Sequence, residues 1–456
     1  MATVLVALAV TELSPSQMSV GKVMTVPPPA TELITPARKA APNAAAAWIQ
    51  SSAGKIPAYA GMAIMVTSVA GVYISYPFCA QKCTYCNFAS GVFPREQEMR
   101  YVDRLAAELR AYAWEWIPDT VYLGGGTPST LAIEELDGVM RLIPGRPWRE
   151  ATIEAAPGTV TAERARTWAK CGINRVSLGV QSFVDQEAAA VGRLHKRTTV
   201  LEDISRLRAA GITNINVDLI AGLPHQTAES WNVSLEETIA TGVPHVSVYM
   251  LEVDEDSRLG RELLAGGTRY HAHFVPDDEA TADFYLAACE RLDAAGVPQY
   301  EISNFARPGF QSRHNLKYWT RRPYLGFGVD AHSMLVSATA DQGAVRFASP
   351  DSLEQYIAEA PLQRTEVSRQ AALEESFFLG LRLTRGLDLR ELSAEFGEEG
   401  LGDFENEVSE FLKSGLMEMD GRYVRLTPQG RLLSNEVFQR FLSPLKPAAV
   451  VQRTMT

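Results

Sequence analysis

The sequence predicts an α/β protein in which a partial (β/α)6 TIM-like barrel is followed by a smaller α+β module. From about residue 72, short β-rich runs alternate with longer amphipathic stretches, which is typical of parallel strands joined by right-handed crossovers. Six runs and a weaker seventh are fewer than the eight strands of a closed barrel, and this favours a partial one. After about residue 350 the alternation stops.

The elements follow in this order. The expected strands are residues 72–75, 120–123, 152–154, 175–180, 216–220, 246–251 and 299–302. Among the expected helices between them are residues 100–114, 200–210 and 280–295. The second module has expected helices at residues 371–384, 388–396 and 403–415, a hairpin at 416–426 and a last helix at 428–441. Three helices with a β-wing resemble a winged helix; because no basic helix stands out, docking or lid function is favoured over DNA binding.

The expected domains are an N-terminal extension at 1–68, the barrel at 69–345 and the winged-helix-like module at 346–456. The extension is rich in Ala and Pro and lacks a sustained period. We interpret it as a disordered tail or as the product of a start codon placed too early, with Met65 as the alternative start. The short apolar stretch at residues 4–10 has no basic residue before it, so we expect neither signal peptide nor anchor.

Composition limits the classes of partner. The chain is 46% hydrophobic and 21% charged with a net charge of −11, which indicates a globular protein without an electrostatic footprint for nucleic acid. No apolar run is long enough for a membrane span, so no integral membrane protein is expected. Five cysteines are too few and too uneven for a disulfide framework, and we expect a reducing, cytoplasmic location. Cys171 and Cys289 are interpreted as inert thiols within the fold.

Three cysteines, Cys79, Cys83 and Cys86, lie on one short loop directly after the first strand. This is the end of the strand at which α/β barrels carry their functional loops. Three thiolates can hold three irons of a [4Fe–4S] cubane and leave the fourth iron open to a small molecule. The alternative is a zinc ion, but structural zinc takes four protein ligands, and neither Cys nor His supplies a fourth nearby.

Further polar and glycine residues end the following strands. Gly125, Gly126 and Thr127 belong to a glycine run after the second strand, where backbone can approach a ligand or form an ordinary tight turn. Glu154, Gln181 and Asp218 interrupt or close later strands. Any one of these residues alone is as well explained by structural hydrogen bonding. Three of them at the same opening of the barrel favour a bound ligand. Arg193 is placed to pair with a carboxylate of that ligand.

The motif Cys-x3-Cys-x-aromatic-Cys after a first strand resembles the signature of the radical S-adenosylmethionine (SAM) superfamily. Gly-Gly-Gly-Thr-Pro-Ser, Ile-Glu-x-x-Pro, Arg-Val-Ser-Leu-Gly-Val-Gln-Ser-Phe and Asn-Val-Asp-Leu-Ile-x-Gly-Leu-Pro are similar to its HemN-related branch, over about residues 72–441. The resemblance implies a barrel of the radical SAM type, in which SAM chelates the open iron and one electron cleaves its sulfonium. It also implies a SAM site lined by Tyr73, Tyr85, Gly125, Gly126, Thr127, Glu154, Gln181, Arg193 and Asp218.

Two functions compete within this branch. The oxygen-independent coproporphyrinogen III dehydrogenases of porphyrin biosynthesis carry another Cys two residues after the third cluster ligand, where this chain has Phe88. The ending Asn87-Phe88 resembles the heme chaperones of the branch instead, and His314-Asn315-x-x-Tyr318-Trp319 matches their motif.

Neutral imidazole is a natural axial ligand of heme iron, so His314 is the candidate ligand and His332 a weaker one. The alternative is a histidine satisfied within a turn, with Trp319 in the core. His271 and His273 fall in an insertion and are expected to face solvent. The resemblance implies a heme chaperone whose partners are heme, heme-accepting membrane proteins and an electron donor, with radical enzyme activity and homodimerisation left open.

Overall fold

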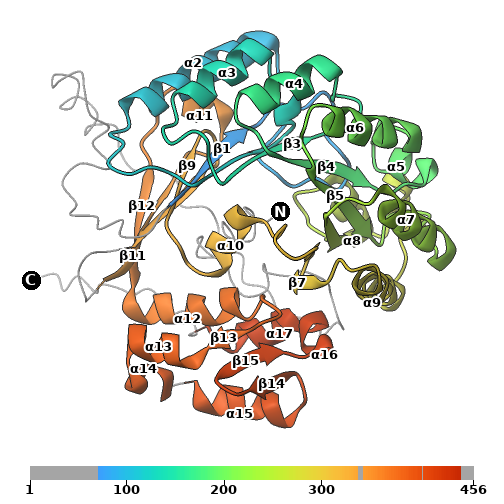
Figure 1. The fold of residues 1–456 in the computed structure, drawn as a ribbon. Helices are drawn as coiled ribbons and strands as arrows, with labels where there is room; N and C mark the ends of the chain where they lie inside the picture. The colour runs from blue at the N-terminus through green and yellow to red at the C-terminus, as the bar shows by residue number, and fades with distance from the viewer. Residues whose placement is uncertain (1–69, 337–341, 403, 443–456) are drawn as a thin grey trace, which may run out of the picture.

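Figure 1 shows the computed structural model of the protein, which describes residues 70–336, 342–402 and 404–442. The expectations for residues 1–68, including the disordered tail and the alternative start at Met65, lie outside the described residues.

A twelve-stranded sheet forms the framework of the barrel (Figure 1). Six consecutive parallel strands lie side by side, as the alternation predicted. They are β1 (Gly71–Tyr76), β2 (Thr120–Gly125), β3 (Glu150–Ala155), β4 (Arg175–Gln181), β5 (Asn214–Ala221) and β6 (His245–Met250). The helices between them are α2 (Arg95–Ala111), η3 (Pro128–Thr130), α3 (Ile133–Arg141), α4 (Ala162–Lys170), α5 (Asp185–Ala190), α6 (Arg197–Ala209) and α7 (Ala228–Thr241). The predicted α/β fold class is confirmed.

The parallel strands are apolar because both of their faces are covered. Every residue of β1 is buried, and Val72, Val121 and Ile153 on successive strands are 0% exposed. Two of the outer helices begin at a threonine cap: the Thr161 hydroxyl accepts from the backbone N–H of Arg164 at the start of α4, and the Thr227 hydroxyl from that of Ser230 at the start of α7. The apolar runs in the sequence therefore predicted the positions of these strands.

The two edges of the sheet differ from the expectation. The seventh expected strand is β7 (Gln299–Glu301), a short antiparallel strand that is separated from β6 by β8 (Asn304–Ala306). At the other edge, β9 (Tyr324–Phe327) pairs parallel with β1, followed by antiparallel strands β10 (His332–Val336), β11 (Gln342–Ala348) and β12 (Gln363–Ser368). The sheet thus continues past the boundary expected at residue 345. Strand β12 is mostly exposed, so it lacks the apolar pattern that would have revealed it.

Helix α10 (Arg313–Trp319) lies within the arc of the sheet (Figure 1). Its N-terminus is held by the buried carboxylate of Glu150, which accepts from the backbone N–H groups of Arg313 and His314, both at 2.9 Å. Lys317 forms a 2.7 Å ion pair with Asp119 at the start of β2. A carboxylate at a helix N-terminus is favourable both as a cap and toward the helix dipole. These bonds fix α10 against β2 and β3.

The C-terminal module contains the expected helices and hairpin, with the last expected helix divided in two. Its elements are α12 (Arg369–Gly380), β13 (Leu387–Asp388), α13 (Leu389–Phe396), α14 (Glu398–Gly402), α15 (Glu405–Lys413), β14 (Met417–Asp420), β15 (Tyr423–Leu426), α16 (Pro428–Leu432) and α17 (Ser434–Gln439). It is joined to the barrel by a buried ion pair between Arg382 and Glu301, at 3.2 Å. The Arg382 guanidinium also lies 4.3 Å from the ring centroid of Trp319.

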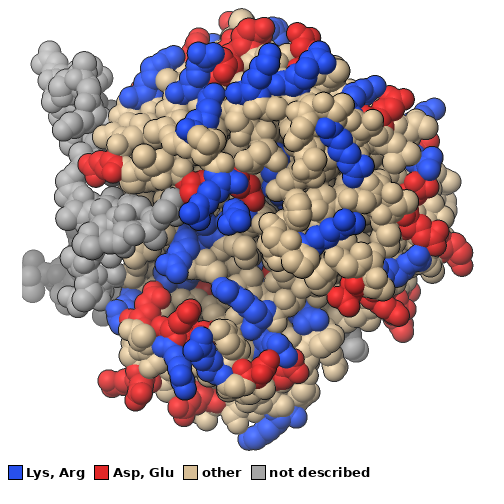
Figure 2. Space-filling view, viewed as in Figure 1, with Lys and Arg blue, Asp and Glu red and all other residues tan. Residues whose placement is uncertain are grey.

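Four further elements complete the described chain: α8 (Arg258–Leu264), η4 (Arg269–Phe274), α9 (Asp278–Ala294) and α11 (Leu353–Ile357). On the face shown in Figure 2, basic and acidic side chains are interspersed over the upper helices and over the C-terminal module. Within the described residues, no helix is sufficiently long and apolar to cross a membrane.

Candidate functional site: a cavity beneath the cysteine loop

The loop that carries Cys79, Cys83 and Cys86 follows β1 directly, and all three cysteines are partly exposed. Backbone bonds hold the loop at several points: Cys79 N–H donates to Gly91 O at 2.8 Å and Thr84 N–H to Val191 O at 3.2 Å. Asn87 donates to Asp254 at 2.5 Å, which ties the loop to the segment before α8. The cysteines are thus presented by a braced loop.

The three cysteines border an open cavity with about 1060 Å³ of empty space, counted together with the solvent at its opening. The structure brings most of the sequence-predicted residues to this one cavity: its lining includes Tyr85, Gly125, Gly126, Thr127, Glu154, Gln181, Arg193, Asp218 and His314. Phe88, which stands where the dehydrogenases carry a cysteine, also lines it. In the described structure Tyr73 and His332 lie outside this lining. Tyr73 is buried behind Tyr122, with ring centroids 6.1 Å apart, and His332 is 5% exposed.

Gly126 explains the glycine run after β2. Its N–H donates to Tyr76 O at 2.7 Å, and Thr127 N–H donates to Phe78 O at 2.9 Å, so the two loops lie edge to edge. A Cβ at position 126 would lie 2.7 Å from Phe78 O and 3.0 Å from Cys79 Sγ. Gly125 has a φ of +110°, which favours glycine. The run is therefore required by the close approach of the cysteine loop.

Glu154 ends β3 in the wall of the cavity. Its carboxylate accepts from the Tyr122 hydroxyl at 2.9 Å and from the backbone N–H of Gly125 at 3.1 Å. Burial raises the pKa of this carboxyl group. Glu154 therefore joins the glycine run to the third strand.

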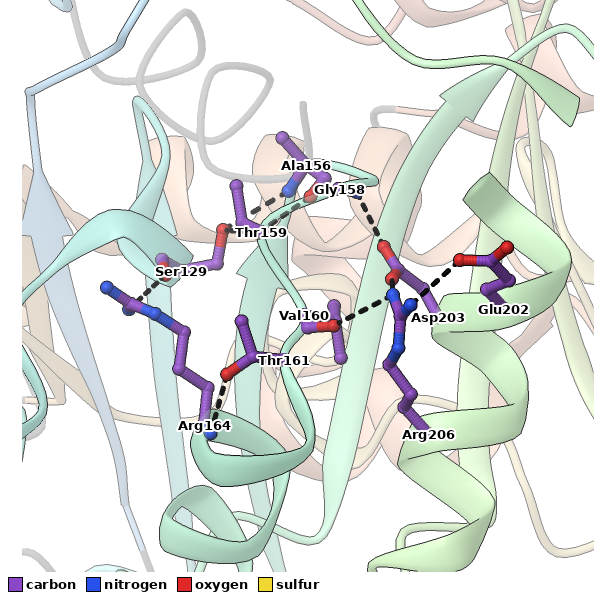
Figure 3. A network of polar contacts seen from close by, with 10 residues as sticks. All are labelled: Ser129, Ala156, Gly158, Thr159, Val160, Thr161, Arg164, Glu202, Asp203 and Arg206. Carbon is purple, nitrogen blue, oxygen red and sulfur yellow. Dashed lines mark hydrogen bonds and ion pairs between the residues drawn. The ribbon is translucent and has the colours of Figure 1, made fainter. Parts of the chain in front are cut away.

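A polar network braces the chain just after Glu154 (Figure 3). The hydroxyl of Ser129 in η3 accepts from Ala156 N–H at 3.2 Å and from the Thr159 hydroxyl at 2.7 Å. On the other side, Gly158 N–H donates to Asp203 of α6 at 2.6 Å. The loop that supplies Ala155 and Ala156 to the cavity lining is thus fixed on both sides.

Gln181 and Arg193 also line the cavity. Gln181 has a φ of +68°, unusual for a residue with a side chain, at an irregularity in the pairing of β4 with β5. Arg193 donates to the Tyr85 hydroxyl at 3.0 Å, while its buried Nε has no hydrogen-bond partner among the described residues. A Cβ at Gly179 would lie 2.9 Å from an Arg193 nitrogen, so a side chain there would displace the guanidinium.

Asp218 on β5 is held by Asn216 at 2.7 Å and by Ser177 at 3.0 Å. Asn216 continues the hydrogen-bond chain to His245, whose other ring nitrogen lies 2.9 Å from the Tyr300 hydroxyl. The carboxylates Glu154 and Asp218 are therefore both hydrogen-bonded within the protein, and both line the cavity.

His314 lies in the first turn of α10 and is 0% exposed. Its Nδ1 lies 2.9 Å from the Thr120 hydroxyl and its Nε2 2.8 Å from the Tyr318 hydroxyl. Burial lowers the pKa of His314 to about 3. The geometry is that of a neutral histidine satisfied within the protein, with Trp319 in the core. The sequence separation between His314 and the cysteines is not a separation in space, because they line one cavity.

Sequence reasoning missed the tyrosines of the cavity wall, Tyr122 and Tyr249, and the capping residue Glu150. Tyr122 and Tyr249 interrupt apolar runs of β2 and β6 with a hydroxyl, a signal that was available. Glu150 could not have been found, since its partner is 164 residues away.

No three His, Cys, Asp or Glu side chains converge on a single metal ion within the described residues. Each thiolate of a cubane binds a different iron, so a cluster does not require such convergence.

Comparison with known proteins places this site in a class. The model of the radical SAM superfamily matches residues 73–237, and that of the HemN C-terminal domain matches residues 367–433. The heme chaperone HemW of Bacillus subtilis is 35% identical over 82% of this chain and 99% of its own length. The HemW of Mycobacterium tuberculosis (strain H37Rv) is 32% identical over 84% of this chain and 97% of its own.

Among solved structures, the coproporphyrinogen III oxidase HemN from Escherichia coli has a TM-score of 0.70 at 23% identity, covering 82% of this chain and 90% of that one. This structural similarity supports the fold alone.

The barrel and its cysteine loop define a radical SAM protein. Within that superfamily, the chain belongs to the HemN-related family of the heme chaperones HemW.

Proposed function

We propose that this protein binds heme and delivers it to membrane acceptor proteins from the cytoplasm, and that it carries a [4Fe–4S] cluster and SAM. The observation that supports the proposal is the single cavity shared by the three cysteines, the residues of the SAM motifs and the heme-chaperone motif of α10. Full-length similarity to proteins named heme chaperones supports the choice of cargo.

The residues fit the cluster and SAM. Three thiols on a braced loop are the donor set of a site-differentiated cubane, with Cys79, Cys83 and Cys86 as its ligands. Gly126 leaves room against the Cys79 sulfur that any side chain would fill. The Nε of Arg193, which has no hydrogen-bond partner in the described part of the chain, is a donor suited to a carboxylate such as that of SAM. When bound, the cluster supplies one electron to the sulfonium of SAM.

The protein's own groups would orient SAM and exclude water. The residues of the cavity lining that would do so include Gly125, Gly126, Thr127, Gln181 and Arg193. The half-buried carboxyl groups of Glu154 and Asp218 are acceptors for ribose or ammonium protons. Tyr73 would support the site indirectly, by packing against Tyr122 of the cavity lining.

The competing function is oxidative decarboxylation of coproporphyrinogen III. Phe88 at the cavity offers no thiol in place of the extra cysteine, which supports the chaperone.

The test is anaerobic reconstitution of the full chain, optical titration with heme and a parallel assay on coproporphyrinogen III. Stoichiometric heme binding without conversion of the porphyrinogen is expected. Robust decarboxylation, or the absence of heme binding by cluster-loaded and cluster-free protein alike, would reverse the proposal. A heme-loaded sample mixed with apo-cytochrome in membrane vesicles then checks delivery, which should deplete heme from the chain.

A further inference from the structure

The positions of the histidines restrict where heme iron can be ligated. The chain has seven histidines. Four are buried: His195, His245, His314 and His332. His245 and His314 use both ring nitrogens in hydrogen bonds within the protein. Heme iron can bind either of these two rings only if one of the hydrogen bonds is broken, although His314 lines the cavity beside the cysteines.

The other three histidines meet at one place on the surface, around Phe274 of η4. The ring centroids of His225 and His273 each lie 4.0 Å from that of Phe274, and that of His271 lies 6.4 Å away. Phe274 is 47% exposed and Tyr270 is 36% exposed. We call these five residues, His225, Tyr270, His271, His273 and Phe274, the imidazole cluster.

The backbone is bent to assemble this cluster. His225, Tyr270 and His271 have φ values of 69°, 55° and 60°, in the left-handed region that side chains other than glycine rarely adopt. The N–H of His225 donates to Phe274 O at 2.9 Å and fixes the two segments together. Non-glycine residues in this region are concentrated at binding and active sites, because the surrounding structure must hold them there.

A hydrogen bond between His225 and His271 orients the His271 ring for binding a metal. Nε2 of His225 lies 3.1 Å from Nδ1 of His271. In the tautomer in which His271 donates, its Nε2 keeps the free lone pair that a metal requires. Iron-ligating histidines typically donate their other ring nitrogen in this way, which fixes tautomer and orientation. His271 is exposed, so its Nε2 is accessible from solvent.

The charges nearby suit an anionic macrocycle. Arg258, Arg261 and Arg269 lie on α8 and at the start of η4, and all are exposed. None of them forms an ion pair with a carboxylate in the described part of the chain, although Arg258 donates to Lys82 O and lies 5.4 Å from the ring centroid of Tyr270. Guanidinium groups bind carboxylates such as heme propionates well.

The cluster of imidazoles also lies beside the cysteine loop. Leu259 N–H of α8 donates to Thr84 O at 2.8 Å, and Leu259 packs with Ala272 of η4 against Tyr85. The surface is therefore continuous with the elements that form the cavity.

We propose that the imidazole cluster is a surface heme site, with His271 Nε2 as an axial ligand and His225 as the residue that positions it. Phe274 and Tyr270 contact the macrocycle, and the three arginines pair with its propionates. This inference rests on the proposed function and assigns its heme to an exposed site, from which an acceptor can take it. A bare metal ion fits less well, because the described residues do not gather three ligands for one ion, whereas heme iron brings four nitrogens of its own.

The experiment titrates the full-length, anaerobically reconstituted chain with hemin and determines the axial ligand by EPR and resonance Raman spectroscopy. His271→Gly suits the positive φ and leaves space for free imidazole. It should abolish the imidazole-ligated spectrum, and added imidazole should restore that spectrum. His225→Asn, also tolerant of positive φ, should weaken heme binding by about 10- to 100-fold, as loss of a ligand's outer partner typically does.

Controls use exposed residues elsewhere. Met419→Ala in the C-terminal module and Arg110→Ala on α2 should bind hemin like the wild type, whereas Arg261→Ala with Arg269→Ala should bind more weakly. Thermal unfolding checks that each variant is folded. Wild-type-like binding by both His271→Gly and His225→Asn would overturn this inference and leave the proposed function standing. The inference would also be overturned if His314→Ala were the only variant to lose the imidazole-ligated spectrum. Failure of the wild type to bind hemin would overturn both.

Discussion

Gly126→Ala tests whether the cysteine loop and the glycine run form one site. Gly126 does not have a positive φ, so alanine is conformationally acceptable and the effect is steric. The new methyl group would meet Phe78 O at 2.7 Å, a Pro77 backbone carbon at 2.9 Å and Cys79 Sγ at 3.0 Å. Backbone atoms cannot rotate away as side chains do. Overpacking of this kind typically costs about 1–3 kcal/mol. It would be relieved by displacement of the loop, and hence of Cys79.

The assay measures iron and sulfide after anaerobic reconstitution, together with the urea midpoint of the cluster-free protein. We expect Gly126→Ala to hold less iron and to unfold at lower urea. Gly138→Ala is the matched control, because its Cβ would meet no atom within 4 Å and it lies on helix α3. There alanine should stabilise by about 0.5–1 kcal/mol. Full cluster loading and an unchanged midpoint for Gly126→Ala would show that the close approach of the two loops is not needed.

Three further predictions concern the cluster, pH and the module interface. Single Ala variants of the loop cysteines should lose the roughly four irons of a cubane, while Cys171→Ala should keep them; zinc without iron in the wild type would contradict this. Burial lowers the pKa of His314 from 6.5 to about 3. Unfolded chains therefore bind a proton that native chains do not, and stability should fall as pH decreases from about 6.5 toward 3. His314→Gln should reduce the fall in stability between pH 6.5 and 3. An unchanged slope would refute the attribution of that fall to His314. Arg382→Ala leaves the fully buried Glu301 unpaired and should destabilise by about 3–5 kcal/mol, measured by denaturant unfolding, whereas Arg385→Ala should not.

The sequence by itself determined the six parallel strands and the cysteine loop. Strands such as β1 are buried on both faces, so their apolar runs are continuous and can be recognised in the sequence without tertiary information. The three cysteines are within eight residues, and their chemistry depends on local spacing. The residues of the SAM motifs follow strands of one parallel sheet, whose ends must meet at one edge, and all of these except Tyr73 line the cavity.

Only the tertiary structure decided the environment of the histidines. In sequence, the histidine of the α10 motif is either an axial ligand or a histidine satisfied within a turn, and the pair at 271 and 273 is expected to face solvent, which the structure confirms. In the fold, Glu150 and Thr120 from distant strands draw His314 into the barrel and satisfy it. The same folding joins His225 to an insertion 46 residues further along. Whether an imidazole has a free nitrogen depends on its hydrogen-bond partners and burial. Tyr318 is only four residues from His314, but Thr120 for His314 and His225 for His271 come from segments far apart in the chain, so no local pattern encodes these partners.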